Sequence, residues 1–257
     1  MKNISIALFQ LNSKLDSLNQ KLEIEEYLNQ VASNTAIILL PEMFLYGPYK
    51  AFENIENDNE SLNFLIKMAK KYKKIIIGSA LTQVNSNKRN RAYVVYPNGN
   101  YAFYDKKKMF GKEKGLLREG DKHLIIQVNG WKILILLCYE LRFPEWSRMN
   151  KQEYDAIIYL AQWPDKRIDA WNTLLKARAI ENLSYVIGVN GSGGDYPGKS
   201  QVVDPEGNKI LDLENDITWK EITFKFENLI RIREDLPFLK DRDNFVLLNQ
   251  NFSDKEE

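Results

Sequence analysis

A chain of 257 residues, 44% of them hydrophobic, can bury the core of one large α/β domain, and no Gly/Ser/Pro-rich linker divides it. We predict a single domain over residues 1–257, in which residues 236–257 form a C-terminal extension. The formal net charge of +1, from 36 basic and 35 acidic residues, excludes the strong positive field that nucleic-acid-binding proteins carry.

The sequence also disfavours secretion and membrane insertion. Only Met1-Lys2-Asn3 precedes the first apolar run, which leaves no room for a signal peptide. No apolar run approaches the roughly 18 residues of a membrane span. The single cysteine cannot form an internal disulfide and stays a free thiol in a reducing compartment. We therefore expect a cytoplasmic protein without a membrane partner.

Apolar runs rich in β-branched residues alternate with amphipathic stretches of helix length. In chain order, we predict a strand at 4–10, a helix at 17–32, a strand at 36–40, a helix at 60–72, strands at 74–80, 92–96, 124–128 and 132–137, a helix at 144–151, a strand at 156–160, a helix at 169–182, and strands at 185–189 and 217–224. This alternation indicates an α/β fold.

Three turn sequences, at 97–100, 129–130 and 204–207, connect strand-like runs and are typical of hairpins, so the sheet is partly antiparallel. A purely parallel barrel is therefore disfavoured. The glycine-rich segment 191–194 follows a strand, but it opens no helix and lacks the lysine of a phosphate-binding loop, which argues against a nucleotide site.

Cys138 is the most informative residue, because it ends the apolar run 133–137 and opens a polar segment. A thiol at such a position can act as a nucleophile; the alternative is a small hydrophobic residue of the core. The only histidine, His123, lies in a polar loop and is expected at the surface. With one cysteine and one histidine, a zinc site of several such ligands is excluded, and a base for Cys138 must be a carboxylate or a lysine.

Two further charged residues follow apolar runs in the same way. Glu42 comes directly after the strand at 36–40 and Pro41, and Lys106 follows the extended run 101–104. Functional groups gather where strands end, because the strand fixes the backbone and the loop gives access. Taken alone, each could equally be a solvated side chain. An ammonium group beside a thiol lowers the thiol pKa and can stabilise an oxyanion.

These segments together resemble the nitrilase superfamily of carbon-nitrogen hydrolases. The resemblance rests on Pro41-Glu42-Met43-Phe44, on Tyr104-Asp105-Lys106 and on the segment 137–145 around Cys138, in the family's order and spacing. The omega-amidase branch, which hydrolyses the terminal amide of 2-oxoglutaramate and 2-oxosuccinamate, is most similar in the segments 138–148, 161–164 and 177–182.

The resemblance implies a role for each matching residue. Glu42 corresponds to the general base, Lys106 to the lysine that stabilises the oxyanion, and Cys138 to the nucleophile. Glu113 is the best match to the family's second glutamate, with Glu119 as the alternative. The chain departs from the family at Lys108, where a histidine is frequent. Such an enzyme uses neither a metal nor an organic cofactor.

Substrate contacts are less defined by the sequence. The backbone N–H of Tyr139 is expected at the oxyanion, Arg142 is a candidate for the substrate carboxylate, and Phe44 and Trp163 are candidates for the pocket wall. For Arg142 the alternatives are that it orients the turn or that it binds Glu145, and for the two aromatic residues the alternative is core packing. Arg178 and Glu181, three residues apart on a helix, are expected to form a structural ion pair.

The resemblance also implies a four-layer α-β-β-α sandwich with mixed sheets, paired into a homodimer. The apolar segments 236–239 and 245–248 either pack across that interface or cover their own subunit. The expected partner is a small-molecule amide. The alternatives to an omega-amidase are an N-carbamoyl hydrolase or other amidase, and a catalytically silent binding partner.

Overall fold

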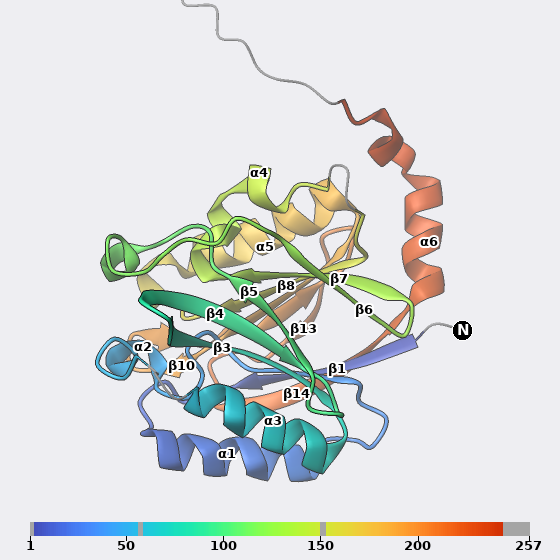
Figure 1. The fold of residues 1–257 in the computed structure, drawn as a ribbon. Helices are drawn as coiled ribbons and strands as arrows, with labels where there is room; N and C mark the ends of the chain where they lie inside the picture. The colour runs from blue at the N-terminus through green and yellow to red at the C-terminus, as the bar shows by residue number, and fades with distance from the viewer. Residues whose placement is uncertain (1–2, 56–58, 150–152, 244–257) are drawn as a thin grey trace, which may run out of the picture.

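Two six-stranded mixed sheets face each other in the computed structural model, which describes residues 3–55, 59–149 and 153–243 (Figure 1). The first sheet has the strand order β14 (Thr218–Lys225), β1 (Asn3–Gln10), β2 (Ile37–Leu39), β3 (Ile75–Val84), β4 (Asn87–Val95) and β5 (Tyr101–Asp105). Strands β1, β2 and β3 run parallel, and the other neighbours are antiparallel.

The second sheet has the order β13 (Lys209–Asp212), β12 (Gln201–Val203), β9 (Tyr185–Asn190), β8 (Ala156–Ala161), β7 (Trp131–Leu137) and β6 (Leu124–Val128). Here β7, β8 and β9 form the parallel centre. A two-stranded sheet of β10 (Ser192–Gly193) and β11 (Tyr196–Pro197) lies beside the two large ones. The three predicted hairpin turns connect β4 to β5, β6 to β7, and β12 to β13.

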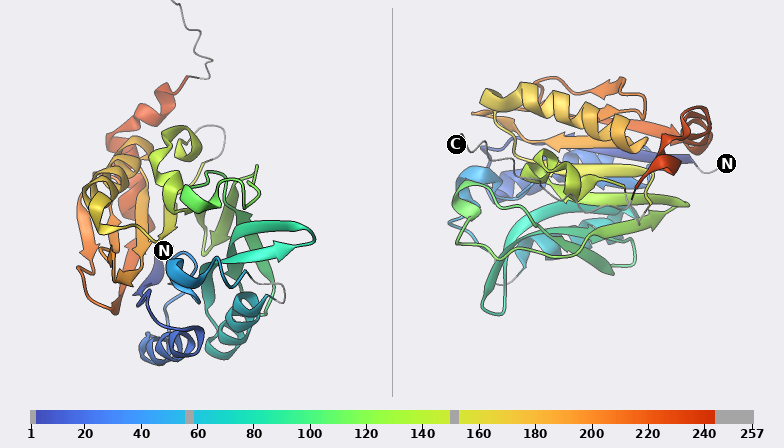
Figure 2. Two further views of the ribbon diagram at one scale, coloured as in Figure 1. Left: turned by 90° about the vertical axis from the view of Figure 1, so that its left-hand side faces the viewer. Right: turned by 90° about the horizontal axis from the view of Figure 1, so that it is seen from above.

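Helices cover both outer faces, which completes the predicted four-layer α-β-β-α sandwich (Figure 2). Helices α1 (Ser17–Gln30) and α3 (Glu60–Tyr72) lie on the first sheet, and α5 (Ile168–Asn182) lies on the second. The remaining helices are short or peripheral: α2 (Gly47–Lys50), α4 (Pro144–Ser147) and α6 (Phe226–Asp235). No helix in the described ranges is long and apolar enough to cross a membrane.

Strand alternation explains the layers. In β1, Ile4, Ile6 and Leu8 join the core between the sheets, while Ala7 and Phe9 point outward into the layer under α1 and α3. Successive strand residues face opposite sides, and both faces of this sheet are covered, so the strand is apolar throughout. The same double coverage accounts for the continuous apolar run before Cys138.

The structure also corrects some expected boundaries. The helix predicted at 144–151 ends at Ser147, because Arg148 is extended at φ −71° and ψ 126°. Helix α6 was not predicted, and strands β12 and β13 were predicted only through the hairpin turn between them, without bounds of their own. In the C-terminal extension, residues 237–241 form a short 3-10 helix, while the segment 245–248 lies outside the described residues.

Candidate active site

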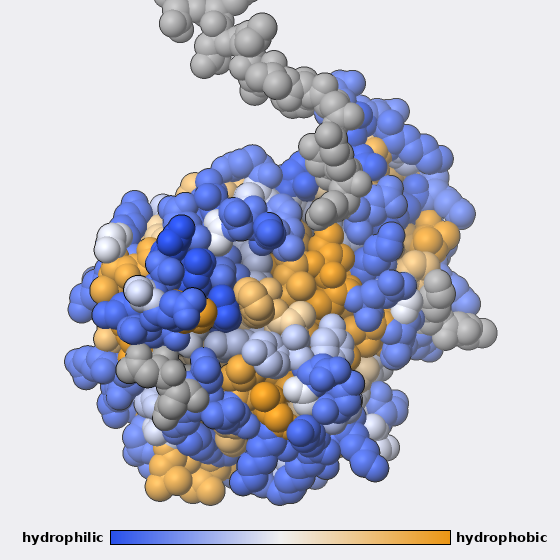
Figure 3. Space-filling view, in the orientation of Figure 1, coloured by the Kyte–Doolittle hydropathy of each residue, from blue (hydrophilic) through white to orange (hydrophobic). Residues whose placement is uncertain are grey.

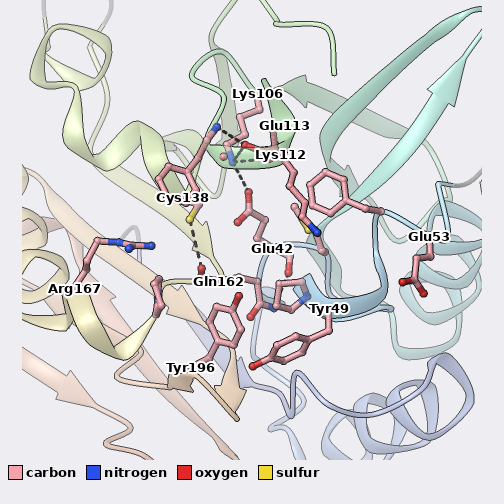
Figure 4. A pocket seen from close by; sticks show the side chains of 16 residues that line it. Glu42, Tyr49, Glu53, Lys106, Lys112, Glu113, Cys138, Gln162, Arg167 and Tyr196 are labelled. Carbon is pink, nitrogen blue, oxygen red and sulfur yellow. Dashed lines mark hydrogen bonds and ion pairs between the residues drawn. The ribbon is translucent and has the colours of Figure 1, made fainter. Parts of the chain in front are cut away.

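Four of the predicted residues line one pocket with a volume of about 430 Å³ (Figure 4). Glu42 follows β2, Lys106 follows β5, Cys138 follows β7, and Glu113 ends the short 3-10 helix Gly111–Glu113. Each of the three charged residues is only 2% exposed, so their charges lie away from bulk water. The strand ends of both sheets therefore meet at a single site.

Lys106 joins the two glutamates. Its Nζ donates to Glu42 Oε1 at 2.8 Å and to both carboxylate oxygens of Glu113 at 2.9 and 2.8 Å. Burial opposes the charge on Lys106, but the two carboxylates outweigh burial and raise its pKa, so Lys106 is an ammonium ion. Its main chain is fixed as well, since its N–H donates to Asn90 O and its carbonyl accepts from Gly120 N–H.

Asn90 on β4 holds the same two glutamates. Its Nδ2 donates to Glu42 Oε1 at 2.8 Å and to Glu113 Oε1 at 2.7 Å. Glu42 Oε1 thus accepts from both Asn90 and Lys106, whereas no donor in the described parts of the chain reaches Glu42 Oε2. That second oxygen is the one available for a proton from a neighbouring group.

Cys138 is buried and lies at a sharp change of backbone direction. Its φ of 39° lies in the left-handed region that residues other than glycine rarely adopt, at the point where β7 passes into the 3-10 helix Cys138–Arg142. Such strain is a feature of nucleophiles held on strand-to-helix turns. The thiol is 9% exposed, and its sulfur lies 3.9 Å from the carbonyl oxygen of Gln162.

The free thiol is protonated at neutral pH. Burial and then the charge of Glu42 raise the pKa of Cys138 well above its ordinary value of 9.0, while Lys106 lowers it by a smaller amount. Lys106 lowers the pKa of the thiol, as expected, but burial and the charge of Glu42 outweigh the ammonium group. A base must remove the proton during the reaction.

The loop that carries Glu42 is fixed to both sheets. Met43, at φ 52°, turns the chain, and its N–H donates to Ser79 Oγ at 3.0 Å. From the second sheet, Gln162 Nε2 donates to the Glu42 carbonyl at 2.8 Å, and Ser13 Oγ donates to Gln162 Oε1 at 2.8 Å. Gln162 therefore contacts both the Glu42 main chain and the Cys138 thiol.

Glu140, which is not among the predicted site residues, links the turn at Cys138 to the segment that follows Lys106. It is fully buried, and its Oε2 accepts from Leu137 N–H at 2.7 Å. Its Oε1 accepts from Tyr104 Oη at 2.6 Å and from the N–H groups of Lys107 and Lys108 at 2.6 and 3.3 Å. Burial raises the pKa of Glu140 to about 7, although these hydrogen bonds oppose the shift.

Arg178 on α5 supports the same turn from behind. Its Nε and Nη2 donate to the Leu141 carbonyl at 3.2 and 2.7 Å, and its Nη1 lies 3.1 Å from Glu181 Oε1. The predicted ion pair is present. Arg178 is 4% exposed, so its side of this ion pair is buried and not on the helix surface. Because its guanidinium also binds the Leu141 carbonyl, Arg178 positions the turn as well.

The predicted substrate contacts separate into two groups. Tyr139, Arg142 and Trp163 border a small recess of about 30 Å³, which shares Cys138 with the main pocket. Phe44 borders neither cavity in the described structure. It is 1% exposed and stacks on Phe64 of α3, with the ring centroids 6.3 Å apart.

The turn at Met43 explains the position of Phe44, since it directs Met43 into the pocket and Phe44 into the core. The pocket wall is instead formed by other residues of the segment after Met43, by residues at the 3-10 helix Gly111–Glu113, and by residues that follow β8 and β9 of the second sheet. Its aromatic lining residues are Tyr49, Phe52, Phe110 and Tyr196. Tyr49 and Phe52 belong to the segment that follows Glu42, whereas Phe110 and Tyr196 are brought to the pocket by the tertiary fold.

His123 lies at the surface, as predicted, and packs against Trp146 with ring centroids 4.2 Å apart. Glu119, the alternative to Glu113, forms an exposed ion pair with Lys107 Nζ at 3.0 Å. Among the residues described, no group of three or more His, Cys, Asp and Glu side chains could hold a metal ion.

Comparisons with known proteins identify the family of this chain. The profile of the carbon-nitrogen hydrolases matches residues 5–222. The omega-amidase YafV of Escherichia coli K12 is 37% identical over 220 residues, or 82% of this chain and 86% of that protein. A 2-oxoglutaramate amidase of Bacillus subtilis is 30% identical over 252 residues, or 93% and 96% of the two chains.

A solved structure from Xanthomonas campestris shows the same fold. It is described as a CN-hydrolase superfamily protein with an arsenic adduct in the active site, and it matches at a TM-score of 0.90 and 29% identity, over 96% of this chain and all of that one. The profile match and the curated relatives establish what the three strand-end motifs predict: the chain belongs to the carbon-nitrogen hydrolase family.

Proposed function

We propose that this amidase-like hydrolase cleaves the terminal amide of a small 2-oxo acid amide, such as 2-oxoglutaramate or 2-oxosuccinamate, with Cys138 as the nucleophile. The observation that carries the proposal is the meeting of Glu42, Lys106 and Cys138 in one pocket. The names of two relatives, an omega-amidase and a 2-oxoglutaramate amidase, support this substrate class.

The first half-reaction transfers the acyl group to the enzyme. Glu42 takes the proton of the Cys138 thiol as the sulfur attacks the amide carbon, so a carbon–sulfur bond forms and the carbonyl oxygen becomes an oxyanion. Lys106 Nζ and the backbone N–H of Tyr139 stabilise that oxyanion. Glu42 then gives its proton to the nitrogen, the carbon–nitrogen bond breaks, and ammonia leaves.

The second half-reaction releases the acid. Glu42 takes a proton from a water molecule, whose oxygen attacks the thioester carbon; the carbon–sulfur bond then breaks and the proton returns to the sulfur. Glu113 supports both steps by holding Lys106, since its carboxylate accepts two hydrogen bonds from that ammonium group. All groups return to their starting protonation states, and the chemistry requires no cofactor.

A panel of amides tests the substrate class. Ammonia release by the purified protein is measured with 2-oxoglutaramate, 2-oxosuccinamate, an N-carbamoyl amino acid and a simple aliphatic amide. We expect the two oxo acid amides to have the highest kcat/KM. Faster turnover of the N-carbamoyl compound would replace the proposed substrate class, and the absence of ammonia from every compound would indicate a catalytically silent binding protein.

A further inference from the structure

The charges of the pocket are unevenly placed. At the Cys138 end, two buried carboxylates, Glu42 and Glu113, surround the single ammonium group of Lys106. Counted as ionised groups, these three leave one negative charge in a site of low solvent access. A substrate carboxylate placed there would be repelled, whereas a neutral amide would not. An acidic amide therefore needs a separate cation for its carboxylate.

Two other cations line the pocket, Lys112 and Arg167. Lys112 is exposed, and no hydrogen bond or ion pair with another described residue fixes its side chain in place. Arg167 is half-buried and lines both the main pocket and the adjoining recess. In Figure 4 its guanidinium group extends toward the part of the pocket that holds Cys138 and Gln162.

The structure holds Arg167 in place without neutralising it. The main-chain N–H of Arg167 donates to the Pro164 carbonyl at 3.1 Å, and the main-chain carbonyl of Arg167 accepts from Trp163 Nε1 at 2.7 Å. The guanidinium carbon lies 5.1 Å from the centre of the Phe110 ring, a cation–π distance. No carboxylate among the described residues forms an ion pair with it, so its N–H groups remain available to a ligand.

Arg142 is placed differently. Its guanidinium carbon lies 4.9 Å from the centre of the Trp163 ring, and it borders the recess but not the main pocket. Arg167 is therefore the arginine that faces the larger volume in which a substrate fits. A planar guanidinium can bind a carboxylate through two parallel hydrogen bonds, which a lysine cannot do.

We propose that Arg167 binds the free carboxylate of the acidic amide and thereby determines the preference of the enzyme for anionic over neutral amides. The carboxylate at Arg167 and the amide at Cys138 fix both ends of the substrate, which orients the amide carbon toward the sulfur. The inference rests on the proposed function and adds the group that recognises the far end of the substrate.

The test compares Arg167→Gln with Lys166→Gln, a matched control that removes the same charge from an exposed neighbour lining neither cavity. Ammonia release is measured with 2-oxoglutaramate and with uncharged pentanamide. We expect Arg167→Gln to lower kcat/KM for 2-oxoglutaramate by about 10- to 100-fold, mainly through KM, and to change that for pentanamide less than about 2-fold. Arg167→Lys should recover part of the loss.

The assignment would be overturned if Arg167→Gln lowered kcat/KM equally for 2-oxoglutaramate and pentanamide, or left both values unchanged. The same selective loss in Lys166→Gln would also overturn it. Calorimetric binding of 2-oxopentanoate, which has the carboxylate but no amide, separates this inference from the proposed function. If the wild type binds it and Arg167→Gln weakens binding by about 10-fold or more, Arg167 is the carboxylate site even where no ammonia is released. Equal binding by both proteins would contradict the inference in either case.

Discussion

At the scale of single residues, the central feature is a thiol that is stored in its protonated form. Burial and the charge of Glu42 raise the pKa of Cys138, and Lys106 only partly offsets them. In the proposed mechanism the thiolate is therefore generated within the reaction, when a neutral amide lies over the sulfur and Glu42 Oε2 accepts the proton. This arrangement protects the thiol from oxidants, which attack thiolates faster than thiols.

This state of Cys138 predicts its reactivity toward an external reagent. The rate of alkylation by iodoacetamide should keep rising with pH up to and beyond the ordinary thiol pKa of 9.0, because the thiolate forms only at higher pH. Intact mass reports the reaction without ambiguity, since the chain has one cysteine. A rate that reaches its plateau below pH 7 would show instead a preformed thiolate.

Asn90 supports the proposed base, and its removal should affect turnover more than binding. With Asn90→Ala, Glu42 Oε1 and Glu113 Oε1 each lose a donor, so we expect a kcat lower by about 10-fold and a stability loss of about 1–3 kcal/mol. Steady-state kinetics and thermal unfolding measure the two effects.

Asn182→Ala is the matched control for Asn90→Ala. Asn182 is equally buried, and its hydrogen bonds to the Arg178 carbonyl and the Met149 N–H lie away from the pocket lining. This variant should lose a similar amount of stability and keep its kcat. A normal kcat in Asn90→Ala, or an equal loss in the control, would remove Asn90 from the support of the site.

At the scale of elements, the site depends on the way in which the ends of β5 and β7 are joined. Glu140 accepts hydrogen bonds from Leu137, just before Cys138, and from Lys107 and Lys108, just after Lys106. One buried carboxylate thus fixes the relative position of two segments from different sheets. Arg178 adds a second anchor from α5.

Glu140 also makes stability depend on pH. Its pKa is about 7 in the folded protein and 4.5 in the reference state, so the folded state binds the proton more tightly. The contribution of this group to stability is therefore highest at low pH, falls as pH rises from about 4.5 to about 7, and is constant above.

The comparison of wild type with Glu140→Gln isolates this contribution, because the amide stays neutral in both states. The unfolding free energy of the wild type, relative to that of the variant, should fall by about 3 kcal/mol over this pH range. Denaturant titrations at several pH values provide the measurement. A difference that does not change with pH would indicate that the folded and unfolded pKa values of Glu140 are equal.

The sequence alone predicts the elements that present the site, since Glu42, Lys106 and Cys138 each follow an apolar run directly. It does not predict the residues whose role depends on contacts between elements. Glu140 is two positions from Cys138 and carries no local signal, because its four donors come from two segments. Arg167 lies in a short polar stretch that reads as a solvated turn, and Phe44 is turned into the core by the backbone of Met43.

At the scale of the whole molecule, the two facing sheets carry the site at their strand ends and leave apolar surface elsewhere. The face shown in Figure 1 has a hydrophobic area near its centre (Figure 3). Apolar side chains are also exposed near the C-terminal end of the described chain, at 48% for Leu236 and 37% for Phe238. Such surface is typical of proteins that associate.

We therefore expect a homodimer in solution. Light scattering should give a mass twice the 30.0 kDa of one chain. If the segment 236–239 contributes to the interface, the double variant Leu236→Asp, Phe238→Asp should shift the protein to a monomer, whereas Ile217→Asp, a similarly exposed residue outside that segment, should not. A mass of one chain for the wild type at micromolar concentration would contradict the dimer.

The most direct test of the account is the rate of ammonia release from 2-oxoglutaramate by wild type and by Cys138→Ala, with thermal unfolding to confirm that both are folded. The variant retains the base, the lysine and the pocket, but it has no sulfur to accept the acyl group. We predict that its rate is lower by about 1,000-fold or more. A Cys138→Ala protein that releases ammonia as fast as the wild type would contradict the central claim.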